Sequence, residues 1–290
     1  MTAEHNVLLL GLYNKYMEQI GVIMLGAIIG DIVGSPYEFT PNNIKTTEFP
    51  LFSKRSCFTD DTVMTVAVAV GIMRGYRDPK ATKNHIIDAL HDYGHAFPSA
   101  GYGQKFYFWM AQKKREPYNS YGNGSAMRVS PVAWAYDTLE EVESYAKISA
   151  EVSHSHPEGI KGACATAAAI FMGRTGATQQ SIKEYISHRY GYDLTRTLEQ
   201  IRPGYVHDES CQGSVPEAIS AFLESTSFED ALRKAVSLGG DSDTVAAICG
   251  SIAEGYYGHL PQEIVDEALA RLDESLITVL VEWRKWLREK

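Results

Sequence analysis

Residues 22–34 read Val-Ile-Met-Leu-Gly-Ala-Ile-Ile-Gly-Asp-Ile-Val-Gly, and the glycines in this stretch recur every four residues. On a helix, Gly26, Gly30 and Gly34 share one face, which allows another backbone to approach closely. The run contains Asp31 and is too short to span a bilayer, so we predict a central, buried helix. An unpaired buried carboxyl group costs several kcal/mol. We therefore expect Asp31 to contact a bound metal through water or to cap a neighbouring helix.

Two short acidic stretches lie far apart in the chain, and each precedes a smooth helical run. They are Thr59-Asp60-Asp61-Thr62 and Gly239-Gly240-Asp241-Ser242-Asp243-Thr244. Asp, Ser and Thr are common at helix starts because they cap free N–H groups, so capping alone would explain either stretch. Two stretches with the same content are harder to explain in this way. Because carboxylate and hydroxyl oxygens suit Mg²⁺, Mn²⁺ or Ca²⁺, we predict that the fold joins both helix starts around divalent cations.

The composition is that of a soluble globular protein, with 44% hydrophobic and 22% charged residues among 290. The net charge of −9 argues against general binding to a nucleic-acid backbone. The four cysteines are far apart and form no C-x-x-C pair, which indicates a reduced, cytoplasmic protein. The apolar run at residues 7–12 is too short to cross a membrane. Residues 1–21 are interpreted as an N-terminal extension of unassigned role.

Helical periodicity dominates the rest of the sequence, and alternating β-branched runs bounded by tight turns are nearly absent. We predict an all-α fold in one domain over residues 22–290, because no Ser-, Gly- or Pro-rich linker divides the chain. Helices are expected at 61–75, 80–96, 102–115, 125–136, 138–151, 158–173, 178–189, 214–225, 228–237, 243–257, 261–271 and 274–289.

Glu38 lies between two aromatic residues in a proline-punctuated loop, residues 35–43. It is either a solvated loop acid or a carboxylate that a mobile flap delivers to a substrate. The sequence pattern alone leaves both interpretations open.

Two further loops contain candidate binding groups. In Ser120-Tyr121-Gly122-Asn123-Gly124, followed by Ser125 as an expected helix N-cap, free backbone N–H groups would suit an anion, although Asn-Gly is also a common turn dipeptide. His154 and His156 lie in a loop between two helices. They are expected to stack on a base, to bond a phosphate or to cap the following helix, rather than to bind metal.

Taken together, these motifs resemble the ADP-ribosylglycohydrolase family, which includes the dinitrogenase reductase-activating glycohydrolase. The resemblance extends from about Met24 to Gly258. It depends on five motifs in the family's order: residues 26–34 with Glu38, Phe58–Thr62, Gly122–Arg128, His154, and Gly239–Thr244.

The resemblance implies an all-α orthogonal bundle with a centre of two Mg²⁺ or Mn²⁺ ions. By position, it implies metal ligands at Thr59, Asp60, Asp61, Asp241, Asp243 and Thr244. It also implies that Glu38 acts on the scissile bond, and that loss of Glu38, Asp60 or Asp243 abolishes activity. The substrate-binding residues that it implies are Ser120, Tyr121, Gly122, Asn123, Gly124 and His154.

The implied activity is metal-dependent hydrolysis of the bond between the anomeric carbon of ADP-ribose and a protein side chain or a related adduct. One alternative is an inactive ADP-ribose-binding or crystallin-like relative. Another is an aspartyl-phosphate phosphatase, whose signature has two aspartates one residue apart, as in Asp241-Ser242-Asp243-Thr244, but that fold needs an apolar strand just before the signature. The type of linkage cleaved, the physiological target, the preferred metal and the oligomeric state are all left open.

Overall fold

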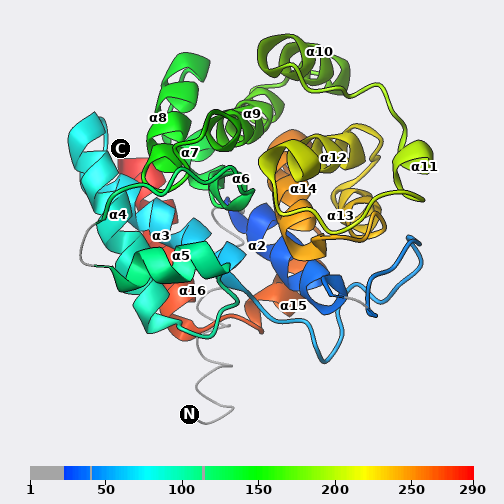
Figure 1. Cartoon of the computed structure of the whole chain (residues 1–290), viewed down its shortest axis with the longest axis horizontal. Helices are drawn as coiled ribbons and strands as arrows, with labels where there is room; N and C mark the ends of the chain where they lie inside the picture. Colours follow the sequence, from blue (N-terminus) through cyan, green and yellow to red (C-terminus); the bar gives the residue numbers. More distant parts are fainter. Residues whose placement is uncertain (1–22, 40, 113–114) are drawn as a thin grey trace.

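The computed structural model describes residues 23–39, 41–112 and 115–290, and they form a helical fold (Figure 1). Apart from an isolated bridge between Gly122 and Ser210, these described residues contain no strand, so the all-α prediction is confirmed. The predicted extension, residues 1–21, lies outside the described residues. The helices are α2 Leu25–Gly34, η1 Ser35–Tyr37, α3 Asp60–Gly75, α4 Pro79–Ala96, α5 Gln104–Ala111, α6 Gly124–Met127, α7 Ser130–Ala135, α8 Leu139–Glu151, α9 Pro157–Arg174, α10 Gln179–Tyr190, α11 Leu198–Ile201, α12 Cys211–Leu223, α13 Phe228–Val236, α14 Ser242–Tyr257, α15 Gln262–Leu269 and α16 Glu274–Glu289.

Most predicted helices are present, with ends that shift by a few residues. The single helix expected over residues 125–136 is wrong, because the chain forms α6 and α7 instead. Pro131 has no N–H and lies in the first turn of α7, where a helix needs no such donor, so a new helix begins there and α6 does not continue. Within the described part of the chain, no helix combines the length and apolarity that a bilayer crossing requires.

Helices α2 and α14 pack against each other in antiparallel directions through the three glycines of α2. A Cβ atom added at any of these glycines would overlap the backbone of α14, with the pairs being Gly26 and Gly250, Gly30 and Ala246, and Gly34 and Ser242. The four-residue spacing of the glycines therefore fixes the register between the two helices, and the prediction of a central buried helix is confirmed.

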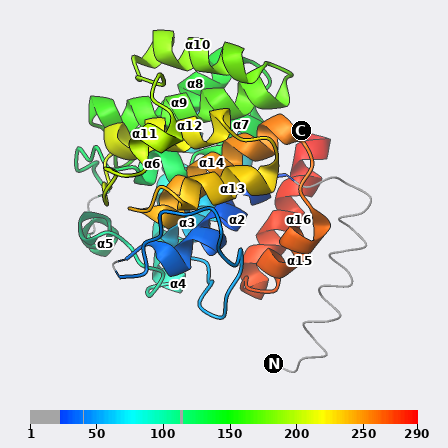
Figure 2. The ribbon, with the colours of Figure 1, turned by 90° about the vertical axis from the view of Figure 1, so that its right-hand side faces the viewer.

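Helix α14 is the centre of the molecule, and it contacts α2, α9, α12 and α13 (Figures 1 and 2). Every residue of α14 from Ser242 to Gly255 is buried. The buried carboxylate of Glu254 accepts hydrogen bonds from the N–H groups of Leu25 (3.2 Å) and Gly26 (2.8 Å), which open α2. Because α2 is antiparallel to α14, this contact sets the other end of α2 beside the start of α14.

Asp31, on α2, caps the start of α3. Its carboxylate accepts hydrogen bonds from the N–H of Thr59 (2.9 Å), the hydroxyl of Thr59 (2.8 Å), and the N–H and hydroxyl of Thr62. Burial raises the pKa of Asp31 to about 6, and these four hydrogen bonds lower it in part. Of the two roles predicted for Asp31, capping is the one observed here, whereas contact with a metal through water stays a prediction.

Gly30→Ala tests the close contact between α2 and α14. The added methyl group would overlap the carbonyl of Ala246, so the two backbones must separate. We expect the free energy of unfolding to fall by about 3 kcal/mol or more, as for a severe overpacking of a core. Gly204→Ala is the matched control, since its Cβ would meet no atom within 4 Å. Denaturant unfolding of both variants measures the effect, and equal stabilities would contradict this packing.

Glu254→Gln tests the buried carboxylate between α14 and α2. Burial raises the pKa of Glu254 from 4.5 to about 7, against smaller effects of its hydrogen bonds and of Arg284. In the unfolded state Glu254 ionises at a lower pH than in the folded state. The folded state therefore loses stability as the pH rises from 4.5 to 7. Relative to Glu254→Gln, the wild type should lose about 3 kcal/mol of unfolding free energy across this window. In unfolding titrations at several pH values, the exposed control Glu263→Gln should follow the wild type.

Candidate active site

The two acidic stretches meet, although they are far apart in sequence. Asp60 and Asp61 occupy the first turn of α3, while Asp241 is the N-cap of α14 and Asp243 lies in its first turn. The Thr244 hydroxyl donates a hydrogen bond to Asp61 Oδ1 at 3.3 Å, so the two helix starts are in direct contact. The geometric prediction that the two helix starts come together is confirmed.

Glu38 reaches the same cluster from the loop that follows α2 and η1. Ligand oxygens of Glu38, Asp241 and Asp243 lie within 4.8 Å of one another. Asn43 holds the loop in place, because its side-chain amide donates to the carbonyls of Glu38 (2.8 Å) and Gly240 (3.0 Å). Glu38 is therefore close enough to share a cation with two of the predicted ligands, a possibility that the sequence did not indicate.

Mutual repulsion and burial disfavour ionisation throughout this cluster. The pKa values of Asp60, Asp61 and Asp243 are well above the usual range, first because the groups are buried and then because neighbouring carboxylates repel their charge. Burial and the charge of Asp241 raise the pKa of Glu38 to about 7. Such a concentration of carboxyl groups is unfavourable without a compensating positive charge.

The donor set fits a divalent cation. Asp61 Oδ2 is buried and has no hydrogen-bond partner among the described residues, so one hard oxygen atom is left for a cation. The other candidate donors, carboxylate and hydroxyl oxygens, are also hard ligands suited to Mg²⁺ or Mn²⁺. Asp241 is oriented by the Asn123 amide, which donates to its Oδ2 at 2.7 Å.

Thr59 differs from the other predicted ligands. Its hydroxyl donates to Asp31 Oδ1 at 2.8 Å and accepts from the Asp61 N–H at 3.2 Å, as the N-cap of α3. Thr59 is also the one predicted site residue that does not line the cavity described below. Only one lone pair of this hydroxyl is left for a metal, and its role as a ligand stays a prediction.

The glycine turn at residues 120–124 forms another wall of the site. The N–H of Gly122 is bound by the Ser120 hydroxyl (3.1 Å), and the N–H of Asn123 is bound by the carbonyl of Glu209 (2.8 Å). Neither of these N–H groups is free for a phosphate, in contrast to what the sequence suggested. Gly124 lines the cavity and its N–H opens α6, where the helix offers it no acceptor, so this N–H is the candidate anion donor of the turn.

Two expectations about the residues near this turn have clear outcomes. The prediction that Ser125 is an N-cap is wrong, because Asn123 holds that position and the Ser125 hydroxyl donates to the Gly159 carbonyl at 2.7 Å. The suggestion that His156 caps the next helix is confirmed, because its Nδ1 accepts from the Glu158 N–H at 3.1 Å.

His154 lies beneath the glycine turn and is buried. Its Nδ1 is 2.8 Å from the hydroxyl of Ser153, which also accepts a hydrogen bond from the buried guanidinium of Arg128. Burial, with the positive charge of Arg128, holds the pKa of His154 well below its usual range. His154 is therefore neutral near pH 7, while Arg128 supplies a positive charge to this wall.

A cavity of about 670 Å³ connects these groups, and its size is typical of a site for a small molecule or cofactor. All predicted site residues except Thr59 line it. Sequence analysis missed the segment at residues 205–210, which we call the strap. His207, Asp208, Glu209 and Ser210 of the strap line the cavity, and the N–H of Cys211 donates to the Tyr121 carbonyl at 2.9 Å.

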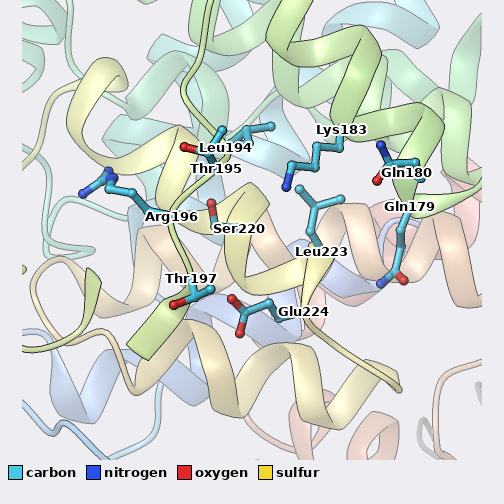
Figure 3. Close-up of a pocket in the computed structure, with 10 residues that line it drawn as sticks. All are labelled: Gln179, Gln180, Lys183, Leu194, Thr195, Arg196, Thr197, Ser220, Leu223 and Glu224. Carbon is cyan, nitrogen blue, oxygen red and sulfur yellow. The ribbon is translucent and has the colours of Figure 1, made fainter. Parts of the chain in front are cut away.

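A second, smaller hollow of about 260 Å³ lies between α10, the loop at residues 194–197 and α12 (Figure 3). In the close-up, Lys183 extends from α10 toward Ser220 and Leu223 of α12. None of the predicted site residues lines this hollow. The chemistry that the sequence predicts is therefore confined to the larger cavity.

Comparisons with known proteins show to which family the chain belongs. The sequence model of the ADP-ribosylglycohydrolase family matches residues 13–289. The chain is 25% identical over 318 residues to the ADP-ribosylhydrolase ARH3 of Mus musculus, covering 81% of this chain and 82% of the relative. It is also 26% identical over 280 residues to the ADP-ribosylarginine hydrolase Tri1 of Pseudomonas putida (strain GB-1), covering 84% and 72% respectively.

A solved structure with a similar fold is described as an ADP-ribosylglycohydrolase-related protein complex. It has a TM-score of 0.62 at 23% sequence identity, and the match covers 90% of this chain and 96% of that one. At this identity the likeness supports the fold alone. Because the family model spans nearly the whole sequence, the chain belongs to the ADP-ribosylglycohydrolase family.

Proposed function

We propose that this protein is a metal-dependent hydrolase that releases ADP-ribose from a modified protein side chain or a related adduct. The observation that carries the proposal is the convergence of Glu38 with the aspartates of two distant helix starts at one cavity. Membership of the family gives the reaction class, since the relatives named above are ADP-ribosyl hydrolases.

The proposed cation ligands are Thr59, Asp60, Asp61, Asp241, Asp243 and Thr244, with Glu38 within reach of the same ions. Two bound Mg²⁺ or Mn²⁺ ions would supply Lewis-acid contacts to the ribose hydroxyls and an activated water. Asn123 and Asp31 act indirectly in this proposal. Asn123 orients the Asp241 carboxylate, and Asp31 holds the start of α3 in position.

Glu38 is the proposed general acid/base. Breaking the bond at the anomeric carbon builds oxocarbenium character on the sugar, and the departing group needs a proton. A carboxyl group with a pKa of about 7 can both hold and release a proton near neutral pH. The raised pKa of Glu38 therefore suits this role.

The glycine turn, together with Arg128 and His154 beside it, is the proposed site for the diphosphate. Arg128 brings a buried positive charge to the cavity lining, and the N–H of Gly124 opens α6 beside it. His154, neutral and buried beneath the turn, contributes a polar surface for the nucleotide without adding charge.

The structure argues against one of the two alternative functions and is compatible with the other. The phosphatase alternative needs a strand before Asp241, but α13 and a short turn precede it. An inactive ADP-ribose-binding relative has the same fold and the same cavity. A release assay with and without Mg²⁺ distinguishes that binder from an enzyme.

Metal binding should increase the stability of the folded protein, and this increase can be measured. Saturating Mg²⁺ or Mn²⁺ should raise the free energy of unfolding of the wild type by about 3 kcal/mol at a hundredfold excess over Kd. Asp60→Asn and Asp243→Asn should lose most of this increase, because each removes a proposed ligand. Thermal unfolding with and without chelator measures it, with the exposed Asp88→Asn as control. If neither ion changes the free energy of unfolding of the wild type, the proposed metal centre is wrong.

Glu38→Gln tests the acid/base role. The amide keeps the size of the side chain but cannot transfer a proton, so release of ADP-ribose should fall by about 10² to 10⁴ in kcat. Binding of ADP-ribose itself should change little. The control is Glu48→Gln, an exposed acid further along the same loop region. Near-full activity in Glu38→Gln would remove Glu38 from the mechanism.

A further inference from the structure

Two parts of the cavity lining carry opposite charges. On the wall formed by the Glu38 loop and the strap, the charged lining groups include the carboxylates of Glu38, Asp208 and Glu209. Lys105 and Arg128 line the cavity beside the glycine turn, which the strap joins through the hydrogen bond from the Asn123 N–H to the Glu209 carbonyl. The charge of an ADP-ribosyl adduct is also unevenly distributed, because its anionic diphosphate lies far from the acceptor. The basic residues suit the diphosphate, and the carboxylates of the Glu38 loop and the strap suit an acceptor with positive charge.

The acidic wall also carries apolar surface at its rim. Phe39 and Val206 are 62% and 71% exposed, although both are large apolar residues. Phe39 stacks on His207 with ring centroids 6.1 Å apart, so the Glu38 loop and the strap meet at this edge. Exposed apolar side chains grouped at the edge of a site are typical of a surface that contacts a macromolecule.

The rim is well fixed in position, as a docking surface requires. The carbonyl of Tyr205 accepts a hydrogen bond from the ammonium of Lys45 (2.6 Å), which anchors the strap from behind. At the other end, the carbonyl of Glu209 accepts from the Asn123 N–H. The Glu209 side chain extends outward, is 75% exposed and pairs with His207 at 3.2 Å.

We propose that Phe39, Val206, Asp208 and Glu209, the acceptor rim, dock a polypeptide in which Lys or Arg flanks the ADP-ribosylated residue. This inference rests on the proposed function, because it assigns the acceptor side of the same cavity. Charge complementarity carries it: the rim has the exposed carboxylate of Glu209 and the half-buried carboxylate of Asp208 beside apolar side chains, and a basic peptide offers cations on aliphatic stems. A nucleic-acid acceptor would place phosphates against Asp208 and Glu209.

The test uses three substrates with one linkage: a lysine-flanked peptide, a glutamate-flanked peptide, and the acceptor group without a peptide. The wild type should prefer the lysine-flanked peptide by about tenfold in kcat/KM, through KM, and added salt should reduce the preference. Glu209→Lys should remove or reverse it, whereas the exposed control Glu199→Lys should not. Equal rates for both peptides, or faster release from an oligonucleotide adduct, would overturn the inference.

Val206→Ser tests the apolar part of the rim. Val206 does not line the cavity, so hydrolysis of the peptide-free adduct should be unchanged. The KM for the lysine-flanked peptide should rise by about threefold, in proportion to the lost apolar contact. Phe108→Ser is the matched control, because Phe108 is 57% exposed on α5 and outside the acceptor rim. An unchanged KM in Val206→Ser, or an equal rise in Phe108→Ser, would count against the docking surface.

A binding measurement separates this inference from the proposed function. Labelled peptides without ADP-ribose should bind the wild type severalfold more tightly when flanked by lysine than by glutamate, and Glu209→Lys should abolish the difference. If the protein releases no ADP-ribose but shows this preference, the proposed function fails and the docking surface stands. If it hydrolyses the adducts and neither assay shows a preference, the docking surface fails and the function stands.

Discussion

The close contact between α2 and α14 is the constraint on which the site depends. Three glycines let the two backbones touch, and their spacing permits one register. That register sets the end of α2 beside the start of α14, so the loop after α2 delivers Glu38 to Asp241 and Asp243. Asp31 then adds the third component, because its carboxylate holds the first turn of α3, and with it Asp60 and Asp61. One short helix therefore positions every carboxylate of the proposed metal centre.

Electrostatics opposes this assembly, and packing sustains it. The aspartates are buried next to one another, and their raised pKa values record the cost of that arrangement. A fold that depended on the site for its stability would fail without cations. Here the contacts that hold α2, α3 and α14 together are made by glycines, by Asp31 and by Glu254, and none of these is among the six proposed cation ligands. The scaffold can thus tolerate an unfavourable site, which is common for functional centres.

The sequence predicted the helical class and the meeting of residues 59–62 with 239–244, because helix-start chemistry and glycine spacing are local signals. It could not predict the strap, since residues 205–210 have no periodic pattern and acquire a role only by pairing with Gly122. Likewise, which N–H groups of the glycine turn are free depends on Ser120 and Glu209, and the second of these is remote in the chain. The break between α6 and α7 was readable in principle from Pro131, but the surrounding periodicity obscured it.

The pairing of α2 with α14 also has a consequence for biosynthesis. The two helices that make the central contact come from nearly opposite ends of the chain, so most of the polypeptide must leave the ribosome before either finds its partner. Until then the apolar glycine face of α2 stays exposed to solvent. Closing so long a loop is also an entropically costly step in folding. A product truncated before residue 241 would lack both the partner of α2 and two carboxylates of the acidic cluster, Asp241 and Asp243, so the proposed metal centre could not form in it.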